Sequence, residues 1–134
     1  MKLSPNWKVY AESSSGRFFY DTEDIGRPSN NVFRVRNILL YSTEAKKDIR
    51  EHIHEEIEVP SEDWNSAEYS VILVEIDMSA KKHRTLSVAY YKCGDIKFHE
   101  VTTPSCEADW FPIRKGSTVE GLYELLPKPR FWRL

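Results

Sequence analysis

The sequence predicts an α+β domain built on an antiparallel sheet of about six strands, with a mid-chain surface helix and a C-terminal helix. Three observations lead to this prediction. Aromatic residues make up 13% of the 134-residue chain, and large side chains of this kind favour strands. Short runs are apolar at alternate positions or throughout, with turn-forming residues between them. Only two segments have the apolar spacing of an amphipathic helix.

The predicted strands are bounded by turn residues and cover 7–10, 17–20, 32–41, 69–78, 83–92 and 96–101. Residues 13–16 are expected to form the turn of a first hairpin. The strand at 69–78 is apolar on both faces through its middle, so we expect it at the centre of the sheet. Residues 61–67, which include Trp64, are predicted to be a loop, and a short extended piece is expected at 110–113.

The strand at 32–41 has one face that is more apolar than the other. Phe33 lies on the more apolar face, because side chains alternate along a strand. We therefore expect this face to point to the core, and we expect Arg34 and Arg36 to be solvated. The polar stretch 21–28, which precedes this strand, is predicted to hold a tight turn.

Two helices are predicted from apolar residues spaced by three or four positions. Ser42 or Thr43 can cap the first helix, which carries a narrow apolar stripe of Ala45, Ile49, Ile53 and Ile57. The second begins with a capping box of Ser117 and Glu120, and Pro127 ends it. Its apolar side consists of Val119, Leu122, Tyr123 and Leu126.

Length, charge and composition exclude several classes of protein. The length is that of one domain, which we expect to span 1–134. There are 19 Lys and Arg against 21 Asp and Glu, whereas a dedicated nucleic-acid-binding domain is usually basic. No apolar run approaches the roughly 18 residues of a transmembrane helix, and the first residues do not read as a signal peptide. We expect no nucleic-acid partner and no cofactor.

No motif of a known catalytic or nucleotide-binding site is present in the sequence. Glu75 and Asp77 share one face of a predicted strand, and paired carboxylates can act as acid and base. Basic residues near them favour surface ion pairs instead. His83 and His99 are predicted on adjacent strands but toward opposite ends. We therefore expect a protein that is not an enzyme.

The alternative is a small metal-binding or enzymatic domain that uses one face of the first helix. Asp48, His52 and Glu56 are spaced by four residues, so their side chains line up on one helix face. Carboxylate and imidazole groups are common metal ligands. Solvated helix faces carry the same pattern, and we favour that interpretation.

Cys93 and Cys106 are too few to make a zinc site, which normally has four protein ligands. They either form one disulfide or remain thiols. In a regular hairpin Cys93 lies at the turn and Cys106 near the far end, a distance that counts against pairing.

Two short basic segments are candidates for contact with anionic partners such as polysaccharides, lipid headgroups or acidic proteins. The first is a predicted turn with Lys81, Lys82 and Arg84. The second is the C-terminal tail, where basic and aromatic residues mix and the candidates are Lys128, Arg130 and Trp132.

Several short motifs follow one another along nearly the whole chain. The N-terminal ones are Trp7-x-Val9, Gly16-x-x-x-Tyr20-Asp21, Ile25, Arg27 and Val32-Phe33-x-Val35. The later ones are the strand 69–77, Arg84-x-Leu86-x-x-x-x-Tyr91 and Trp110-x-x-Ile113-x-x-Gly116-Ser117-x-x-Glu120-x-Leu122. In this order, the set resembles the bacterial surface-adhesin protein E-like family.

The resemblance implies an antiparallel sheet with few helices and a non-catalytic interaction domain of the bacterial cell envelope, in the periplasm or at the outer-membrane surface. It implies a protein or another extracellular or envelope macromolecule as partner. A free edge of the sheet can in addition pair two copies into a homodimer. The family usually has a cysteine where Met78 stands and a second near its C-terminus, where this chain runs on through Leu126, so the disulfide of the family is missing.

Overall fold

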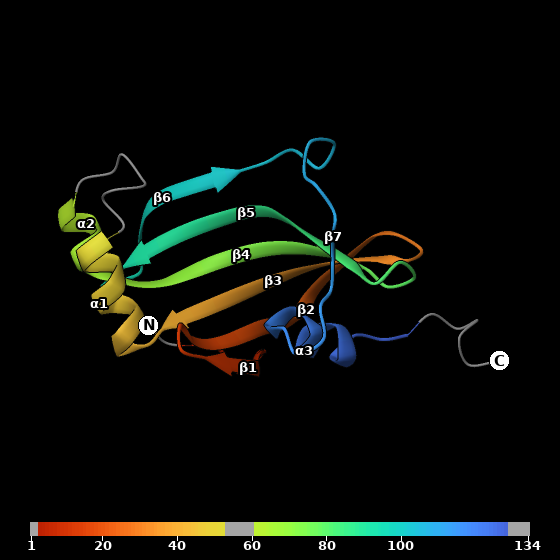
Figure 1. Cartoon of the computed structure of the whole chain (residues 1–134), viewed down its shortest axis with the longest axis horizontal. Coiled ribbons are helices and arrows are strands. Elements are labelled where there is room, and N and C mark those ends of the chain that lie inside the picture. The colour runs from red at the N-terminus through yellow and green to blue at the C-terminus, as the bar shows by residue number, and fades with distance from the viewer. Residues whose placement is uncertain (1–2, 53–60, 129–134) are drawn as a thin grey trace.

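The sheet is a meander, in which each long strand pairs with the next one along the chain (Figure 1). The computed structural model describes residues 3–52 and 61–128. In these residues the antiparallel strands are β1 (Trp7–Ser13), β2 (Gly16–Ser29), β3 (Val32–Tyr41), β4 (Ala67–Asp77), β5 (Lys82–Lys92) and β6 (Ile96–Thr102). This is the predicted antiparallel sheet, and strands dominate the α+β fold.

The order of the strands places β4 between β3 and β5, as its apolar sequence predicts. The outer edge of β5 is shared by two partners. β6 pairs with the half of β5 that runs from Ser87 to Lys92. The short strand β7 (Phe111–Pro112) pairs with the other end of β5, at Lys82 and His83.

The predicted turn at 21–28 is wrong, because β2 continues through this stretch. Tyr20 pairs with Asn37 and Ile25 pairs with Val35, so β2 advances five residues while β3 advances two. The surplus residues form a bulge, which lets the polar sequence leave the ladder and return. Ile25 then packs against the buried core, and this contact keeps β2 on the sheet.

A glycine is required at the start of β2. Gly16 has a φ of +143°, and a Cβ built on it would lie 1.9 Å from the carbonyl oxygen of Leu40. The serines before it form the predicted hairpin turn between β1 and β2. Only a residue without a side chain allows β3 to pass this closely.

The first predicted helix is present as α1 (Thr43–His52), with Ser42 Oγ accepting a hydrogen bond from the Ala45 amide at 3.0 Å. None of the described side chains of α1 is buried. Ala45 and Ile49, from the expected apolar stripe, are half-buried. The remaining stripe residues, Ile53 and Ile57, lie outside the described residues.

The predicted loop at 61–67 instead contains a short helix, α2 (Ser61–Asn65), whose first turn is acidic. Acidic side chains stabilise a helix start. Trp64 is only 2% exposed. Its ring lies edge-on to the rings of Tyr90 and Phe98, with centroid distances of 5.0 and 4.8 Å, so α2 is anchored on β5 and β6.

The C-terminal helix is α3 (Thr118–Leu125), and it is capped as predicted, since Ser117 Oγ accepts a hydrogen bond from the Glu120 amide at 3.3 Å. The Glu120 carboxylate accepts from the Gly116 amide rather than from Ser117. Gly121 allows the helix to approach β1 closely, because a Cβ there would lie 3.1 Å from the Tyr10 carbonyl oxygen.

The sheet buries residues on both faces. The face under α3, called the helix face, carries the larger cluster of buried side chains: Val35, Val74, Ile76, Met78, Ile113, Leu122, Tyr123 and Leu126. Phe33 belongs to this face, as predicted. The opposite face carries a smaller cluster of Phe19, Ile38 and Tyr69. None of the helices in the described residues is long and apolar enough to cross a membrane.

Candidate functional site

Two of the predicted basic residues meet on the ring of Tyr123. Lys81 Nζ, from the β4–β5 turn, lies 5.3 Å from the ring centroid, and Lys128 Nζ, beyond α3, lies 3.8 Å from it. Lys128 also donates a hydrogen bond to the Tyr123 carbonyl oxygen at 3.2 Å. The two basic segments, which are distant in sequence, therefore share one place in the fold.

A third lysine joins this pair through Glu120. The Glu120 carboxylate forms an ion pair with Lys81 at 3.4 Å. The pKa of Glu120 lies below its ordinary value, mainly because the Gly116 amide donates to the carboxylate, and further because Lys81 and Lys115 are positively charged nearby. We call Lys81, Lys115 and Lys128 the lysine cluster. Sequence reasoning missed Lys115, whose only signal was its place just before the helix cap.

The other predicted basic residues do not join the lysine cluster. Lys82 and Arg84 lie two apart on β5, opposite Asp77 and Glu75, so they point to the face away from α3. Arg130 and Trp132 lie outside the described residues.

Arg84 is occupied by three contacts within the protein. It donates to Glu75 Oε1 at 2.9 Å and to the Ser105 carbonyl oxygen at 2.8 Å. Its guanidinium lies 4.2 Å from the centroid of the Trp110 ring. Arg84 therefore holds the loop after β6, and its contact with a partner stays a prediction.

Glu75 is a buried ion-pair partner rather than a surface one. The residue is 1% exposed. Arg84 holds one carboxylate oxygen, and Arg34 donates to the other at 2.8 and 3.0 Å. The expectation that Arg34 is solvated holds only in part, since its side chain is 43% exposed but its guanidinium pairs with Glu75 on the neighbouring strand. Arg36 is exposed, as expected.

Asp77, the second carboxylate of the predicted pair, stabilises a turn. Asp77 Oδ1 accepts hydrogen bonds from the Ser79 amide, the Ser79 hydroxyl and the Ala80 amide, at 2.9 to 3.1 Å. It thus shapes the β4–β5 turn. Both side chains therefore make contacts that hold the fold together.

The candidate metal residues come together only in part. Ligand atoms of Asp48, Glu51 and His52 lie within 4.8 Å of one another, and all three residues are exposed. Glu56, the predicted third ligand, lies outside the described residues. Glu51 takes its place in the group, although the sequence analysis did not select it.

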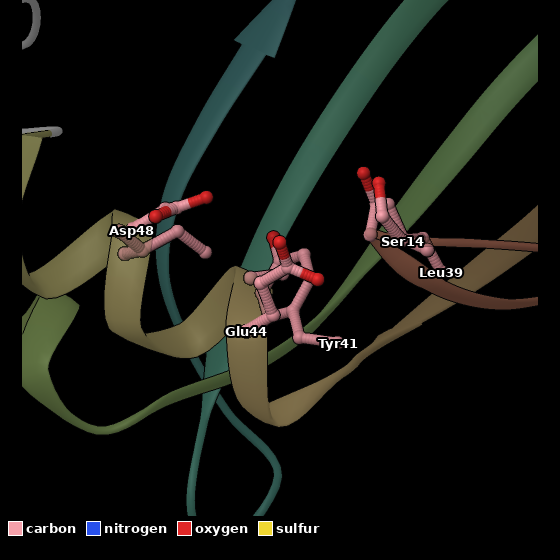
Figure 2. A pocket seen from close by; sticks show the side chains of 8 residues that line it. Ser14, Leu39, Tyr41, Glu44 and Asp48 are labelled. Carbon is pink, nitrogen blue, oxygen red and sulfur yellow. The ribbon is translucent and has the colours of Figure 1, made fainter.

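A pocket of about 240 Å³ lies beside this group, between α1, the β1–β2 turn and the end of β3. Figure 2 shows Glu44 and Asp48 on α1, with Ser14 and Leu39 across from them. The pocket is open to solvent and carries two carboxylates at its edge. It would therefore bind a cation only weakly, and it would repel an anion.

The histidines and cysteines do not form pairs. His83 lies opposite Ile76 and His99 opposite Tyr90, at different ends of β5. Cys93 and Cys106 are exposed thiols. The seven-residue strand β6 separates them, a length of roughly 23 Å, whereas a disulfide needs Cα atoms within about 7 Å.

Two adjoining hollows lie on the helix face next to α3. One, of about 150 Å³, reaches from Tyr10 and Phe18 to Leu122. The other, of about 330 Å³, extends from α3 to Phe111 and Arg114. Both are lined by His83, Thr118 and Val119, which form the wall between them.

Comparison with known proteins shows a likeness of fold. The selenomethionine form of protein E from Haemophilus influenzae has a TM-score of 0.54 and 6% identity, over 92% of this chain and 87% of that one. Protein E from non-typeable Haemophilus influenzae has a TM-score of 0.52 and 7% identity, over 92% and 76%. No protein-family model and no curated protein matches the sequence. At this level of identity, the likeness establishes a protein E-like fold.

Proposed function

We propose that this chain is a non-catalytic binding domain of the bacterial cell envelope, and that its lysine cluster contacts an anionic surface on a protein or another envelope macromolecule. The observation that carries the proposal is the meeting of Lys81 and Lys128 on Tyr123. Two chain segments converge to present amino groups at one position, which is what a preformed contact surface requires.

The local charge favours an anionic partner. Two of the three lysines, Lys81 and Lys115, lie near Glu120. The pKa of Glu120 is lowered by the Gly116 amide and by these two lysines, so its carboxylate stays ionised at neutral pH. One carboxylate offsets one lysine, and a positive surplus is left. The side chain of Lys81 is 45% exposed, so its amino group is reachable from solvent. Complementary charge of this kind speeds association and gives specificity.

The envelope location and the macromolecular partner rest on the fold. The protein E-like architecture agrees with the resemblance seen in the ordered sequence motifs. Glu75 and Asp77, the paired carboxylates, hold neighbouring groups of the fold, and this supports a structural role for both.

Heparin, a sulfated polysaccharide, is a suitable probe for the lysine cluster. The double variant Lys115→Gln/Lys128→Gln is compared with the wild type on a heparin column developed with NaCl. We expect the variant to elute at a clearly lower salt concentration, since attraction between exposed charges is screened by salt. The matched control is Lys46→Gln/Lys47→Gln on α1, at the other end of the sheet (Figure 1). Equal loss in both variants would show only a net-charge effect and would overturn the proposal.

Location is tested separately in the organism that encodes the chain. Fractionation of cells into cytoplasm, periplasm and membranes, followed by detection with an antibody, should place the protein in the envelope. Recovery with cytoplasmic markers would overturn the envelope proposal and leave the binding proposal to stand on the heparin result.

A metal-binding protein is the second candidate, and the observation that favours it is the proximity of Asp48, Glu51 and His52. Zinc titration by calorimetry distinguishes the two candidates. Tight one-to-one binding that disappears in His52→Ala would support a metal function, whereas weak binding that survives this substitution would remove it.

A further inference from the structure

The smaller hollow on the helix face has the features of a ligand pocket. Its volume is about 150 Å³, and it lies between α3 and the floor of the sheet. Phe18, Ile72, Val74 and Leu122 give it an apolar lining. A cavity of this size accommodates a molecule the size of benzene.

Asn37, which is also a lining residue of the pocket, carries an unused hydrogen-bond acceptor. The residue is 2% exposed, and its Nδ2 donates to the carbonyl oxygens of Val35 and Ile72 at 3.2 and 3.4 Å. These contacts fix the orientation of the amide, because a flipped amide would place its oxygen against two other oxygens. Asn37 Oδ1 has no hydrogen-bond partner among the described residues. An acceptor that is buried without a partner costs free energy, which a ligand can recover.

The charge of the pocket selects the kind of ligand. None of its described lining residues is Asp, Glu, Lys or Arg. His83, at one end of the lining, is half-buried, and its burial lowers the pKa of the imidazole, so the ring is neutral at pH 7. A charged ligand would lose its hydration without gaining a counter-charge.

We propose that this pocket binds a small neutral molecule with an apolar body and one hydrogen-bond donor, such as a phenol, and that the donor pairs with Asn37 Oδ1. The oxygen is covered by its neighbours, so binding requires a small outward movement of the lining. The pocket is separate from the lysine cluster, and this proposal stands independently of the proposed function.

The test compares phenol with toluene on the ¹⁵N-labelled wild-type protein by NMR titration. The two molecules have nearly the same shape, but only phenol carries a donor. Toluene is the more hydrophobic, so burial alone predicts that toluene binds more tightly. We nevertheless expect phenol to bind more tightly, because its hydrogen bond contributes about threefold to tenfold and also removes the cost of leaving Asn37 Oδ1 without a partner. The shifted amides should include those of Val119 and Leu122.

Variants then locate the interaction. Asn37→Leu should weaken phenol binding about threefold to tenfold while leaving toluene binding unchanged or stronger. Val119→Phe, which fills the pocket from α3, should abolish binding of both molecules. Ala45→Phe, in the separate pocket beside α1, is the matched control and should change neither affinity.

Three results would overturn the proposal: no shifts around the pocket, toluene binding as tightly as phenol, or an unchanged phenol affinity in Asn37→Leu. If Asn37→Leu does not fold, the comparison of phenol with toluene on the wild type decides alone, because it needs no variant.

Discussion

Arg84 holds the carboxylate of Glu75 at 2.8 Å, at a position where the Glu75 side chain is only 1% exposed. The second oxygen of that carboxylate is taken by Arg34, so a single side chain on β4 is joined to both neighbouring strands. The guanidinium of Arg84 continues the contact to Trp110. The middle of the sheet is thus tied by charge on the face that α3 does not cover.

Replacing the carboxylate should therefore destabilise the protein. Glu75→Gln keeps the size of the side chain but leaves two guanidinium groups without a counter-charge. Because Arg34 is 43% exposed and can turn to water, we expect a loss of about 1–3 kcal/mol rather than the larger cost of a fully buried pair. Urea unfolding measures this loss. The control Glu12→Gln, in an exposed pair with Arg17, should cost well under about 1 kcal/mol. Equal effects would refute the special role of Glu75.

Stability should decrease at alkaline pH because of buried tyrosines. Burial raises the pKa of Tyr41 to about 12 from 10.0, and burial also raises the pKa values of Tyr10 and Tyr69. The unfolded chain ionises first as pH rises, so the contribution of Tyr41 is complete below pH 10 and is lost as pH approaches 12. The full loss from Tyr41 alone is about 2–3 kcal/mol.

The measurement is the urea midpoint at a series of pH values. Tyr41→Phe should reduce the steepness of the decline between pH 10 and 12, while below pH 9 its curve should run parallel to that of the wild type. A variant curve that falls as steeply as the wild-type curve would show that Tyr41 does not contribute.

The two cysteines should react as free thiols in the folded protein. Both are exposed, and β6 lies between them. A thiol-reactive chromophore added without denaturant should count two thiols per chain, and Cys93→Ser should reduce the count to one. An intact mass that is two hydrogens short, with no reactive thiol, would mean that the loop after β6 adopts a different arrangement in the native protein.

The outer edge of β6 should be able to pair two copies of the chain. Ile96 and Val101 on this edge strand are 52% and 50% exposed, and an edge with apolar side chains is prone to pairing. Light scattering at micromolar concentration should give twice the chain mass, and Val101→Lys should halve it. Val9→Lys on β1, at the opposite edge of the sheet, should leave the mass unchanged. If the wild-type protein is monomeric at all concentrations measured, pairing through β6 does not occur.

Local patterns predicted the parts of the fold that local physics determines. The central position of β4 followed from its apolar middle, and the start of α3 followed from Ser117 and Glu120. The prediction of a turn at 21–28 was wrong because Ile25 packs against core residues that are distant in sequence, and adjacent residues do not reveal this contact. Arg34 was assigned to solvent because its partner Glu75 lies 41 residues away in sequence.

The candidate site depended almost wholly on contacts between distant segments. Lys81 and Lys128 were selected from the sequence as candidate contact residues, but only the docking of α3 shows that they share the Tyr123 ring. The sequence could not predict that Asn37 Oδ1 is buried without a hydrogen-bond partner, because this depends on how distant segments pack around it. Polar residues in strands give no sequence signal that separates a solvated position from a buried one.

The order of the strands has a consequence for how the protein is made. Each long strand pairs with its sequence neighbour, so the sheet can assemble progressively as the chain emerges from the ribosome. The helix that covers it follows all of the strands in the sequence, and Gly121 allows that helix to pack closely against Tyr10 of the first strand. Until α3 emerges the helix face is uncovered, because Leu122 and Leu126 follow all of the strands in the sequence. Chains that end before residue 117 should therefore bind a hydrophobic dye, and the unfinished protein is a natural client for chaperones.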